Sequence, residues 1–272
     1  MRMNIKRFQR EVLSYYKKHG RHALPWRKTR DPYRILVSEV MLQQTQVDRV
    51  IPKYKEFLKR FPTFKALAHA KTADVIRAWQ GLGYNRRALA LQRASQVVMR
   101  EHDGKLPRDY DALIALPSVG PYTAGALLTF IWNEPMVFIE TNIRTVFLHH
   151  FFPKKKNVSD KVLENIIAGT LDERRPREWY WALMDYGAHL KKKIGNESVR
   201  SRHYTKQSTF KGSNRELRGN ILRTLSKNSA TLTVLAKTAK RSISETRAAL
   251  EALQKEGFIK RKGRTRFELD AT

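Results

Sequence analysis

Helical spacing of apolar residues runs through the first 190 residues and restricts this part of the chain to an all-α fold. Apolar side chains that recur every three or four residues form one face of a helix. No run in this part alternates convincingly between apolar and polar residues as a strand does. The spacing predicts helices over residues 4–18, 34–60 with a break at Pro52, 72–79, 86–101, 109–115, 122–131, 142–151, 159–170, with Ser159 as its N-cap, and 176–190.

The sequence from Glu216 onward follows a different pattern. Two helical stripes of apolar residues come first, and Ser244 is expected to cap a third helix that ends at Gly257. Residues 258–269 then alternate around Lys262-Gly263, as a β-hairpin does. Three helices and a hairpin resemble a winged helix-turn-helix, a module that binds either protein or DNA. The five basic residues of the hairpin favour nucleic acid, with Lys262 and Arg264 as the expected contacts.

The charge of the chain points to a polyanionic partner. The chain carries 54 Lys and Arg against 25 Asp and Glu, a net charge of +29, which favours nucleic acid. Residues 191–272 hold 21 of the basic and 7 of the acidic residues, and their first part is polar. We therefore expect three parts: a helical domain over 1–190, a basic loop or linker over 191–215, and a winged helix over 216–272.

Composition also excludes several classes of protein. The chain has no cysteine, so we expect no disulfide, zinc finger or iron–sulfur cluster. No apolar run reaches membrane-spanning length, and the first residues lack the apolar stretch of a signal peptide. These features predict a soluble intracellular protein, in the cytoplasm or at the nucleoid, that does not bind membranes.

The segment Leu116–Gly125 (LPSVGPYTAG) lies between two predicted helices. A tight turn at Val119-Gly120 would direct consecutive backbone N–H groups outward at the start of the next helix. Such a turn binds a phosphate without reading sequence. An ordinary helix–helix turn would give the same pattern. The basic charge of the chain favours the phosphate site.

Two carboxylates stand out as candidates for chemistry. Glu39 is the only ionisable residue of the run 35–42, and its burial would raise its pKa as a general acid requires. A structural Glu paired with Arg27 or Arg144 would explain the pattern equally well. Glu140 ends an apolar stretch where a helix begins, a position that N-capping also selects. Glycoside hydrolysis nevertheless uses two carboxyl groups, which come from separate segments of the chain.

Several motifs together resemble the MutY-type adenine DNA glycosylases of the helix-hairpin-helix superfamily, which also contains endonuclease III. The likeness covers about residues 5–190. The motifs that carry it are Leu24–Arg27 (LPWR), Asp31–Tyr33 (DPY), Ser38–Thr45 (SEVMLQQT), Gly81–Tyr84 (GLGY), Leu116–Gly125 and Met184–Ala188 (MDYGA). The resemblance implies a mainly α, two-lobed helix-hairpin-helix glycosylase fold, here followed by the winged helix-turn-helix.

The resemblance also implies roles for individual residues. Glu39 matches the acid that protonates the base, which is flipped out of the duplex. Tyr122 stands where relatives with lyase activity carry a Schiff-base lysine, so we expect base removal without strand cleavage. The remaining candidates are Glu140 and Asn142 in catalysis, Trp26, Arg27, Leu42 and Trp181 around the base, Gln44 and Tyr84 as a wedge in the base stack, and Gln43, Val119, Gly120, Tyr122 and Thr123 on DNA.

The sequence departs from the family's pattern at several places. Glu140 replaces an Asp, and Trp181 replaces a polar residue near the base. The cluster cysteines are absent, with Lys191 where the first would fall, and the domain that reads 8-oxoguanine is replaced by the winged helix. We expect the basic loop to bind DNA without a metal, through Arg200, Arg202 and Lys206. No cofactor is expected. A monovalent cation bound at the helix-hairpin-helix motif is left open as an alternative.

These inferences predict a monomeric, monofunctional DNA glycosylase of base-excision repair. Its expected substrate is double-stranded DNA that carries adenine opposite 8-oxoguanine or guanine. A thymine or uracil mismatch glycosylase is the alternative within the enzyme class. A lesion-binding or regulatory protein that has lost catalysis through Glu140 is the alternative outside it.

Overall fold

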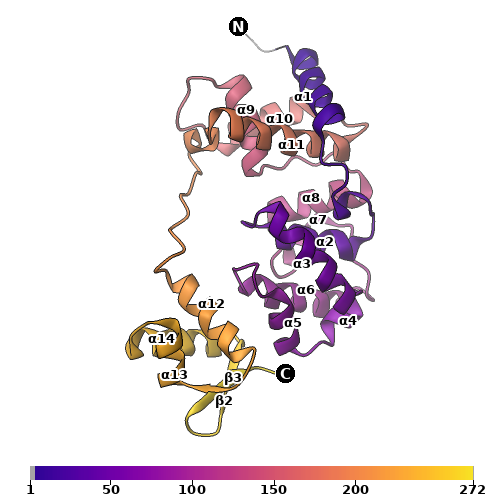
Figure 1. The fold of residues 1–272 in the computed structure, drawn as a ribbon. Helices are drawn as coiled ribbons and strands as arrows, with labels where there is room; N and C mark the ends of the chain where they lie inside the picture. The colour runs from indigo at the N-terminus through magenta and orange to yellow at the C-terminus, as the bar shows by residue number, and fades with distance from the viewer. Residues whose placement is uncertain (1–3, 272) are drawn as a thin grey trace. The chain divides into compact units, whose positions relative to one another are not determined.

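The computed structural model describes residues 4–271 and is mainly helical, as predicted (Figure 1). The first part of the chain forms α1 (Ile5–His19), η1 (Pro25–Arg27), α2 (Pro32–Leu42), α3 (Val47–Arg60), α4 (Phe64–Ala68), α5 (Thr72–Trp79), α6 (Arg86–Glu101), α7 (Tyr110–Ala115), α8 (Pro121–Trp132), α9 (Thr141–Phe151), α10 (Asp160–Thr170), α11 (Pro176–Ile194) and η2 (Glu197–Arg200). The last part forms α12 (Asn214–Leu225), β1 (Ala230–Thr231), α13 (Leu232–Ala239), α14 (Ile243–Lys255), β2 (Ile259–Lys262) and β3 (Arg266–Leu269). No helix within residues 4–271 is long and apolar enough to cross a membrane.

The described chain forms two compact units, each built from separate segments. Unit 1 contains residues 4–36, 108–114 and 119–206, and unit 2 contains residues 37–107, 115–118 and 207–271. Helix α2 therefore begins in unit 1 and ends in unit 2. The division into three parts was predicted from charge and composition, whereas these two units are defined by contacts. The three-part division therefore stays a prediction.

Aromatic side chains fill the core of unit 1, where α1, α9 and α11 pack together. The Phe8 ring is fully buried and lies 5.4 Å from the ring of Phe147 and 5.8 Å from that of Trp179. Helix α11 approaches the start of α9 so closely that a Cβ on Gly187 would lie 2.3 Å from the Asn142 carbonyl oxygen. A glycine at this position therefore determines where the first turn of α9 lies.

Unit 2 has an apolar core that continues from α5 and α6 into the C-terminal module, residues 214–269. Ala73, Ile76 and Leu89 belong to the same buried cluster as Leu217 and Ile221 of α12. Across this junction the Glu256 carboxylate accepts hydrogen bonds from Arg86 of α6, and within the module it accepts from Arg218 of α12. The module is thus docked on α5 and α6 by apolar burial and by the Arg86–Glu256 ion pair.

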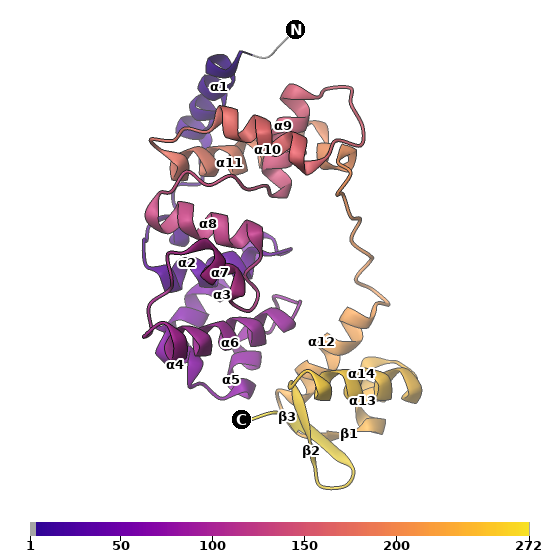
Figure 2. The same ribbon diagram turned by 180° about the vertical axis from the view of Figure 1, so that it is seen from behind.

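The module has the three helices and the hairpin that the sequence predicts, and Figure 2 shows them from behind. Strands β2 and β3 pair antiparallel from Ile259↔Leu269 to Lys262↔Arg266, so residues 263–265 form the turn around Gly263. The short strand β1, which the sequence did not predict, adds to β3 and gives the order β1-β3-β2. That the module works as a winged helix-turn-helix stays a prediction.

Two details of the helix prediction were wrong. The predicted helix over 34–60 breaks at residues 43–46 rather than at Pro52, which lies inside α3. The break occurs because the Arg87 side chain binds the carbonyl oxygens at the end of α2. The last helix is capped by Ser242 rather than Ser244, because Ser242 and Glu245 form a reciprocal capping box.

Glu256 provides a test of how the module is docked. The hydrogen bonds of Arg86 and Arg218 lower the pKa of Glu256 to about 2. A depressed carboxyl pKa stabilises the fold above the unfolded-state pKa, and this contribution is lost as the pH falls towards 2. We expect Glu256→Gln to lower the unfolding free energy by about 1–2 kcal/mol at pH 7, since the partly exposed pair is screened by solvent.

Thermal or urea unfolding of the whole protein between pH 7 and pH 3 measures this effect. The difference between the wild type and Glu256→Gln should shrink as the pH falls. Glu251→Gln is the matched control, since Glu251 is an exposed residue of α14, the helix for which Glu256 is the C-cap. Equal stability of the two variants at pH 7 would show that the ion pairs do not hold the module.

Candidate active site

Glu39 lies on the second half of α2 and is almost completely buried. Its exposed fraction is 5%, and neighbours such as Val37, Val40 and Met41 are fully buried, so the expected burial is confirmed. The two arginines considered as structural partners each bind another carboxylate. Arg27 pairs with Asp185, with an Nη1–Oδ2 distance of 2.7 Å, and Arg144 pairs with Asp160.

The buried guanidinium of Arg87 holds the end of α2. Its Nη1 donates to the carbonyl oxygens of Val40, at 2.8 Å, and Met41, at 3.0 Å, and also to that of Gln43. Its Nη2 donates to Thr45 Oγ1 and to the carbonyl oxygens of Leu82 and Gly83, at 2.9, 3.4 and 3.2 Å. Burial lowers the pKa of Arg87 to about 10, so the group stays charged at neutral pH.

The two turns that Arg87 joins contain the expected wedge residues. Gln44 and Tyr84 both have left-handed backbones, with φ angles of 53° and 46°. This conformation costs a residue with a side chain about 1–2 kcal/mol, so the surroundings must compensate. The hydrogen bonds of Arg87 to residues on both turns provide that compensation. The structure therefore brings Gln44 and Tyr84 together in unit 2, with Leu42 half-buried at the end of α2.

Gln43 belongs to the same turn and is half-buried. Its side-chain amide donates to the carbonyl oxygen of Ser118 at 3.4 Å. This contact ties the turn after α2 to the loop between α7 and α8.

Glu140 caps α9 in unit 1. One carboxylate oxygen accepts from the backbone N–H groups of Asn142, at 2.8 Å, and Ile143, at 2.9 Å, and the other accepts from the Asn142 side chain at 3.1 Å. Burial raises the pKa of Glu140 in spite of these hydrogen bonds and of the nearby Lys191 charge. The N-cap interpretation is confirmed. The same hydrogen bonds fix the orientation of the Glu140 carboxylate.

Three of the four candidates for the base pocket lie in unit 1, where Arg27 belongs to a buried ion pair. Arg27 donates both Nη atoms to Asp185, and Arg21 donates to the same carboxylate. Burial opposes ionisation of Asp185, but the bonds and charges of Arg27 and Arg21 lower its pKa. The Arg27 guanidinium lies 5.5 Å from the Trp181 ring, and Trp26 is buried.

The loop before α8 differs from the expected turn. The left-handed residue is Ser118, with φ of 70°, whereas Gly120 is an extended N-cap of α8. A Cβ at Gly120 would meet no atom within 4 Å, so its backbone is accessible from that side. Tyr122 is half-buried, with its ring 5.7 Å from that of Phe138, while Thr123 is buried. Phosphate binding by this loop, Val119 included, stays a prediction.

The three basic residues expected to bind DNA after α11 have different surroundings. Arg200 donates to the carbonyl oxygens of Leu148, Phe152 and Lys155, and it pairs with Glu197. Its guanidinium thus joins η2 to the end of α9. Arg202 and Lys206 are exposed and remain candidates for DNA contact.

The residues of this chain do not fit the iron–sulfur cluster that belongs to the pattern of the resembled family. Such a cluster needs thiolate ligands, and the chain has no cysteine. Lys191, at the expected position of the first ligand, is a half-buried cation whose pKa burial lowers.

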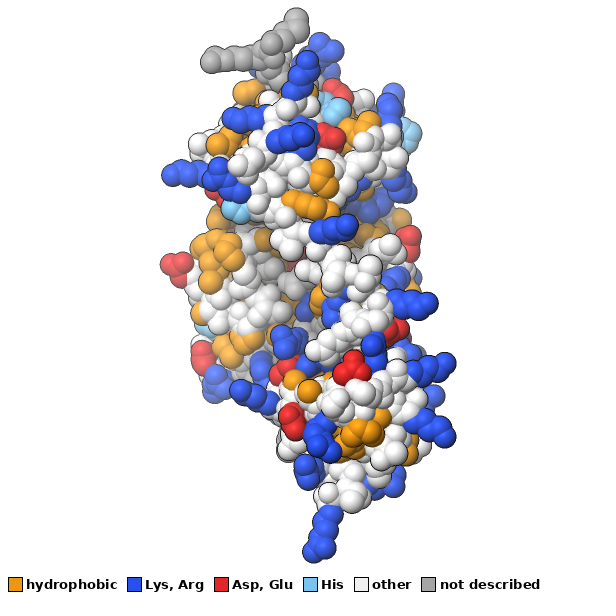
Figure 3. Space-filling view, turned by 90° about the vertical axis from the view of Figure 1, so that its left-hand side faces the viewer, with side chains coloured by type: hydrophobic (Ala, Val, Ile, Leu, Met, Phe, Trp, Pro, Cys, Tyr) orange, Lys and Arg blue, Asp and Glu red, His pale blue; other side chains and the backbone are white. Residues whose placement is uncertain are grey.

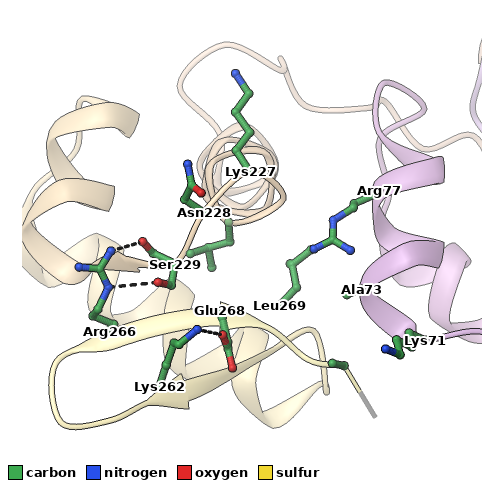
Figure 4. A pocket seen from close by; sticks show the side chains of 12 residues that line it. Lys71, Ala73, Arg77, Lys227, Asn228, Ser229, Lys262, Arg266, Glu268 and Leu269 are labelled. Atoms are coloured by element: carbon green, nitrogen blue, oxygen red, sulfur yellow. Dashed lines mark hydrogen bonds and ion pairs between the residues drawn. The ribbon is translucent and has the colours of Figure 1, made fainter.

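A basic cavity of about 730 Å³ lies in unit 2 where the module meets α5 (Figure 4). Lys262 and Glu268 both line it and form an ion pair at 3.0 Å. The other charged residues of its lining are Lys71, Arg77, Lys227 and Arg266. Arg264 is exposed in the hairpin turn. Lys and Arg side chains are also spread over the face drawn in Figure 3, with fewer acidic side chains among them.

Comparisons with known proteins find a matching family and several similar proteins. Residues 37–168 match the HhH-GPD superfamily base excision DNA repair protein model. The adenine DNA glycosylase of Mycolicibacterium smegmatis is 45% identical over 137 residues, which cover 50% of this chain and 46% of the relative. The thymine/uracil-DNA glycosylase of Pyrobaculum aerophilum is 33% identical over 187 residues, which cover 66% and 81%.

A solved structure of a thermostable thymine-DNA glycosylase has a similar fold. Its TM-score is 0.60 at 25% identity, over 68% of this chain and 86% of that one. This chain spans about half the length of the adenine DNA glycosylases that it matches.

Proposed function

Since the chain belongs to the HhH-GPD superfamily of base excision DNA repair proteins, we propose that it is a DNA N-glycosylase that removes adenine mispaired with 8-oxoguanine or guanine. The observation that carries this proposal is the buried Glu39, next to a turn that Arg87 holds in place. A desolvated carboxylic acid favours its protonated form, which is the form that donates a proton to a leaving base.

In the proposed reaction Glu39 transfers a proton to a ring nitrogen of the flipped adenine. The N-glycosidic bond then breaks, and its electron pair stays with the base, which leaves neutral. Positive charge develops at the sugar carbon, and the ionised Glu140 stabilises it. Water adds to that carbon and gives up a proton to the Glu39 carboxylate, which restores the acid, so that the products are free adenine and an abasic site.

The surrounding residues support flipping and base recognition. Gln44 and Tyr84 enter the stack where the base has left it. Trp26, Arg27, Leu42 and Trp181 are the proposed contacts of the base. Tyr122 offers a phenol rather than an amine, so it forms no Schiff base, and the strand stays intact. The partner is double-stranded DNA, and the protein acts as a monomer.

The choice of adenine rests on sequence similarity. The adenine DNA glycosylase of M. smegmatis is 45% identical over 137 residues, and the thymine/uracil-DNA glycosylase of P. aerophilum is 33% identical over 187 residues. Trp181 favours the second candidate function, removal of thymine or uracil. Its indole ring stacks on Phe130 at 6.0 Å and lies beside Arg27, so it changes the shape of the base pocket.

Glu39→Gln tests both the activity and the acid. The wild type should release adenine from duplexes with A:8-oxoguanine or A:G pairs under single-turnover conditions, and should leave T:G and U:G duplexes intact. Glu39→Gln keeps the shape but has no proton to transfer, so the rate should fall by about two to four orders of magnitude. Duplex binding should survive. Glu56→Gln, an exposed acid of α3, is the control.

Release of thymine or uracil instead of adenine would support the second candidate function. Release of no base by the wild type would contradict the proposed activity, and excision by Glu39→Gln at the wild-type rate would contradict its role as the acid.

Two variants of Glu140 test the proposed role of the second carboxylate independently of Glu39. Glu140→Gln retains an oxygen that can cap α9, so its stability should change by no more than about 1 kcal/mol. It lacks the negative charge, so adenine release should fall by about two orders of magnitude or more. Glu140→Asp keeps the charge and should stay active.

The pH dependence gives a second readout for Glu140. Because burial raises its pKa above 4.5, protonation should slow the wild type as the pH falls, with the acid limb of the profile above that value. Comparison of single-turnover rates with melting temperatures separates the two roles. Equal rates in the wild type, Glu140→Gln and Glu140→Asp would leave Glu140 as a helix cap alone.

A further inference from the structure

The tip of the Tyr84 side chain is held by the chain that follows the glycosylase region. Arg215 Nη1 donates to the Tyr84 hydroxyl at 2.6 Å, and its guanidinium lies 5.2 Å from the ring centroid. The Arg87 guanidinium lies 5.5 Å from the same ring. Gln207 donates to the Tyr84 hydroxyl and, at 3.4 Å, to the side-chain oxygen of Gln44. Both wedge residues therefore contact segment 207–215.

Arg215 is attached to a well-anchored helix. It lies in the first turn of α12, which Ser213 caps and whose residues Leu217 and Ile221 are buried in the shared core of unit 2. Its Nη2 also donates to the carbonyl oxygen of Ser208 at 2.6 Å and to the Ser208 hydroxyl at 3.1 Å. Gln207, by contrast, is an exposed residue outside regular secondary structure.

We propose that Arg215 is a positioning residue that holds Tyr84 in the direction required for insertion into the base stack. This inference rests on the proposed function. A half-buried tyrosine on a turn would otherwise sample several rotamers, and ordering it during DNA binding would cost entropy. Arg215 orders the Tyr84 side chain before DNA binds, because the packing of α12 already orders the Arg215 guanidinium. The entropy cost is then no longer part of the binding step. Gln207 covers the tips of the wedge and is displaced by the duplex.

The consequence is that the C-terminal module contributes to base flipping. Its docking through α5 and α6 places a cation on the wedge tyrosine, in addition to any contact that the module makes with DNA. Removing the Arg215 side chain should therefore impair steps that need the wedge and spare steps that do not.

The experiment compares adenine release from two substrates under single-turnover conditions. One is the mispaired duplex, in which the wedge fills the gap in the stack. The other is a single strand with the same adenine, in which no stack has to be filled. Arg215→Ala should slow release from the duplex by about five- to twentyfold and change release from the single strand by less than about twofold.

Four further variants show whether the effect acts through Tyr84. Arg215→Lys keeps a cationic donor and should recover part of the lost rate. Arg223→Ala removes the same charge from an exposed site on α12 and should behave as the wild type. If Arg215 acts through Tyr84, the double variant Tyr84→Ala/Arg215→Ala should be no slower than Tyr84→Ala.

A binding measurement separates this inference from the proposed function. A 2-aminopurine placed beside the mispair becomes fluorescent when a wedge unstacks it, whether or not a base is released. At saturating protein, Arg215→Ala should give a smaller increase than the wild type and Arg223→Ala. Equal signals and rates for Arg215→Ala and Arg223→Ala would overturn the inference. Faster release by Arg215→Ala would also overturn it, because Arg215 would then block the wedge.

Discussion

The site in unit 2 depends on one buried guanidinium. Arg87 binds the last carbonyls of α2 and the carbonyls of residues 82 and 83, so it joins two turns that are 40 residues apart in sequence. Without these bonds, the carbonyls at the end of α2 and the charge itself would be buried without partners, at a cost of several kcal/mol. The same interaction supports the left-handed backbones of Gln44 and Tyr84 and limits the movement of α2, which carries Glu39.

Unit 1 orients its carboxylate by a different means. Close packing of α11 at Gly187 against the start of α9 fixes the turn in which two backbone N–H groups bind Glu140. In each unit, tertiary packing and backbone hydrogen bonds orient the proposed catalytic carboxylate. The two proposed catalytic carboxylates are therefore both oriented by well-packed helices.

Much of the fold could be predicted from the sequence, because apolar periodicity reports helix faces directly. The helices at 72–79 and 86–101 have the predicted bounds. The break after α2 was misplaced because it depends on Arg87, a distant residue that no local pattern connects with Gln43. Glu39 stood out because a charge in an apolar run is unusual. Asp185 and Arg215 did not, since the partners that give them a role become neighbours only in the folded chain.

Hydrogen–deuterium exchange on the wild type and Arg87→Lys tests the central claim most directly. A lysine ammonium has three donors and cannot reproduce the set of bonds that the planar guanidinium makes. Residues 40–46 and 81–87 should lose protection together in Arg87→Lys, whereas the start of α9 in unit 1 should keep its protection. Unchanged exchange in both turns would contradict the claim that Arg87 holds the end of α2 and the wedge in place.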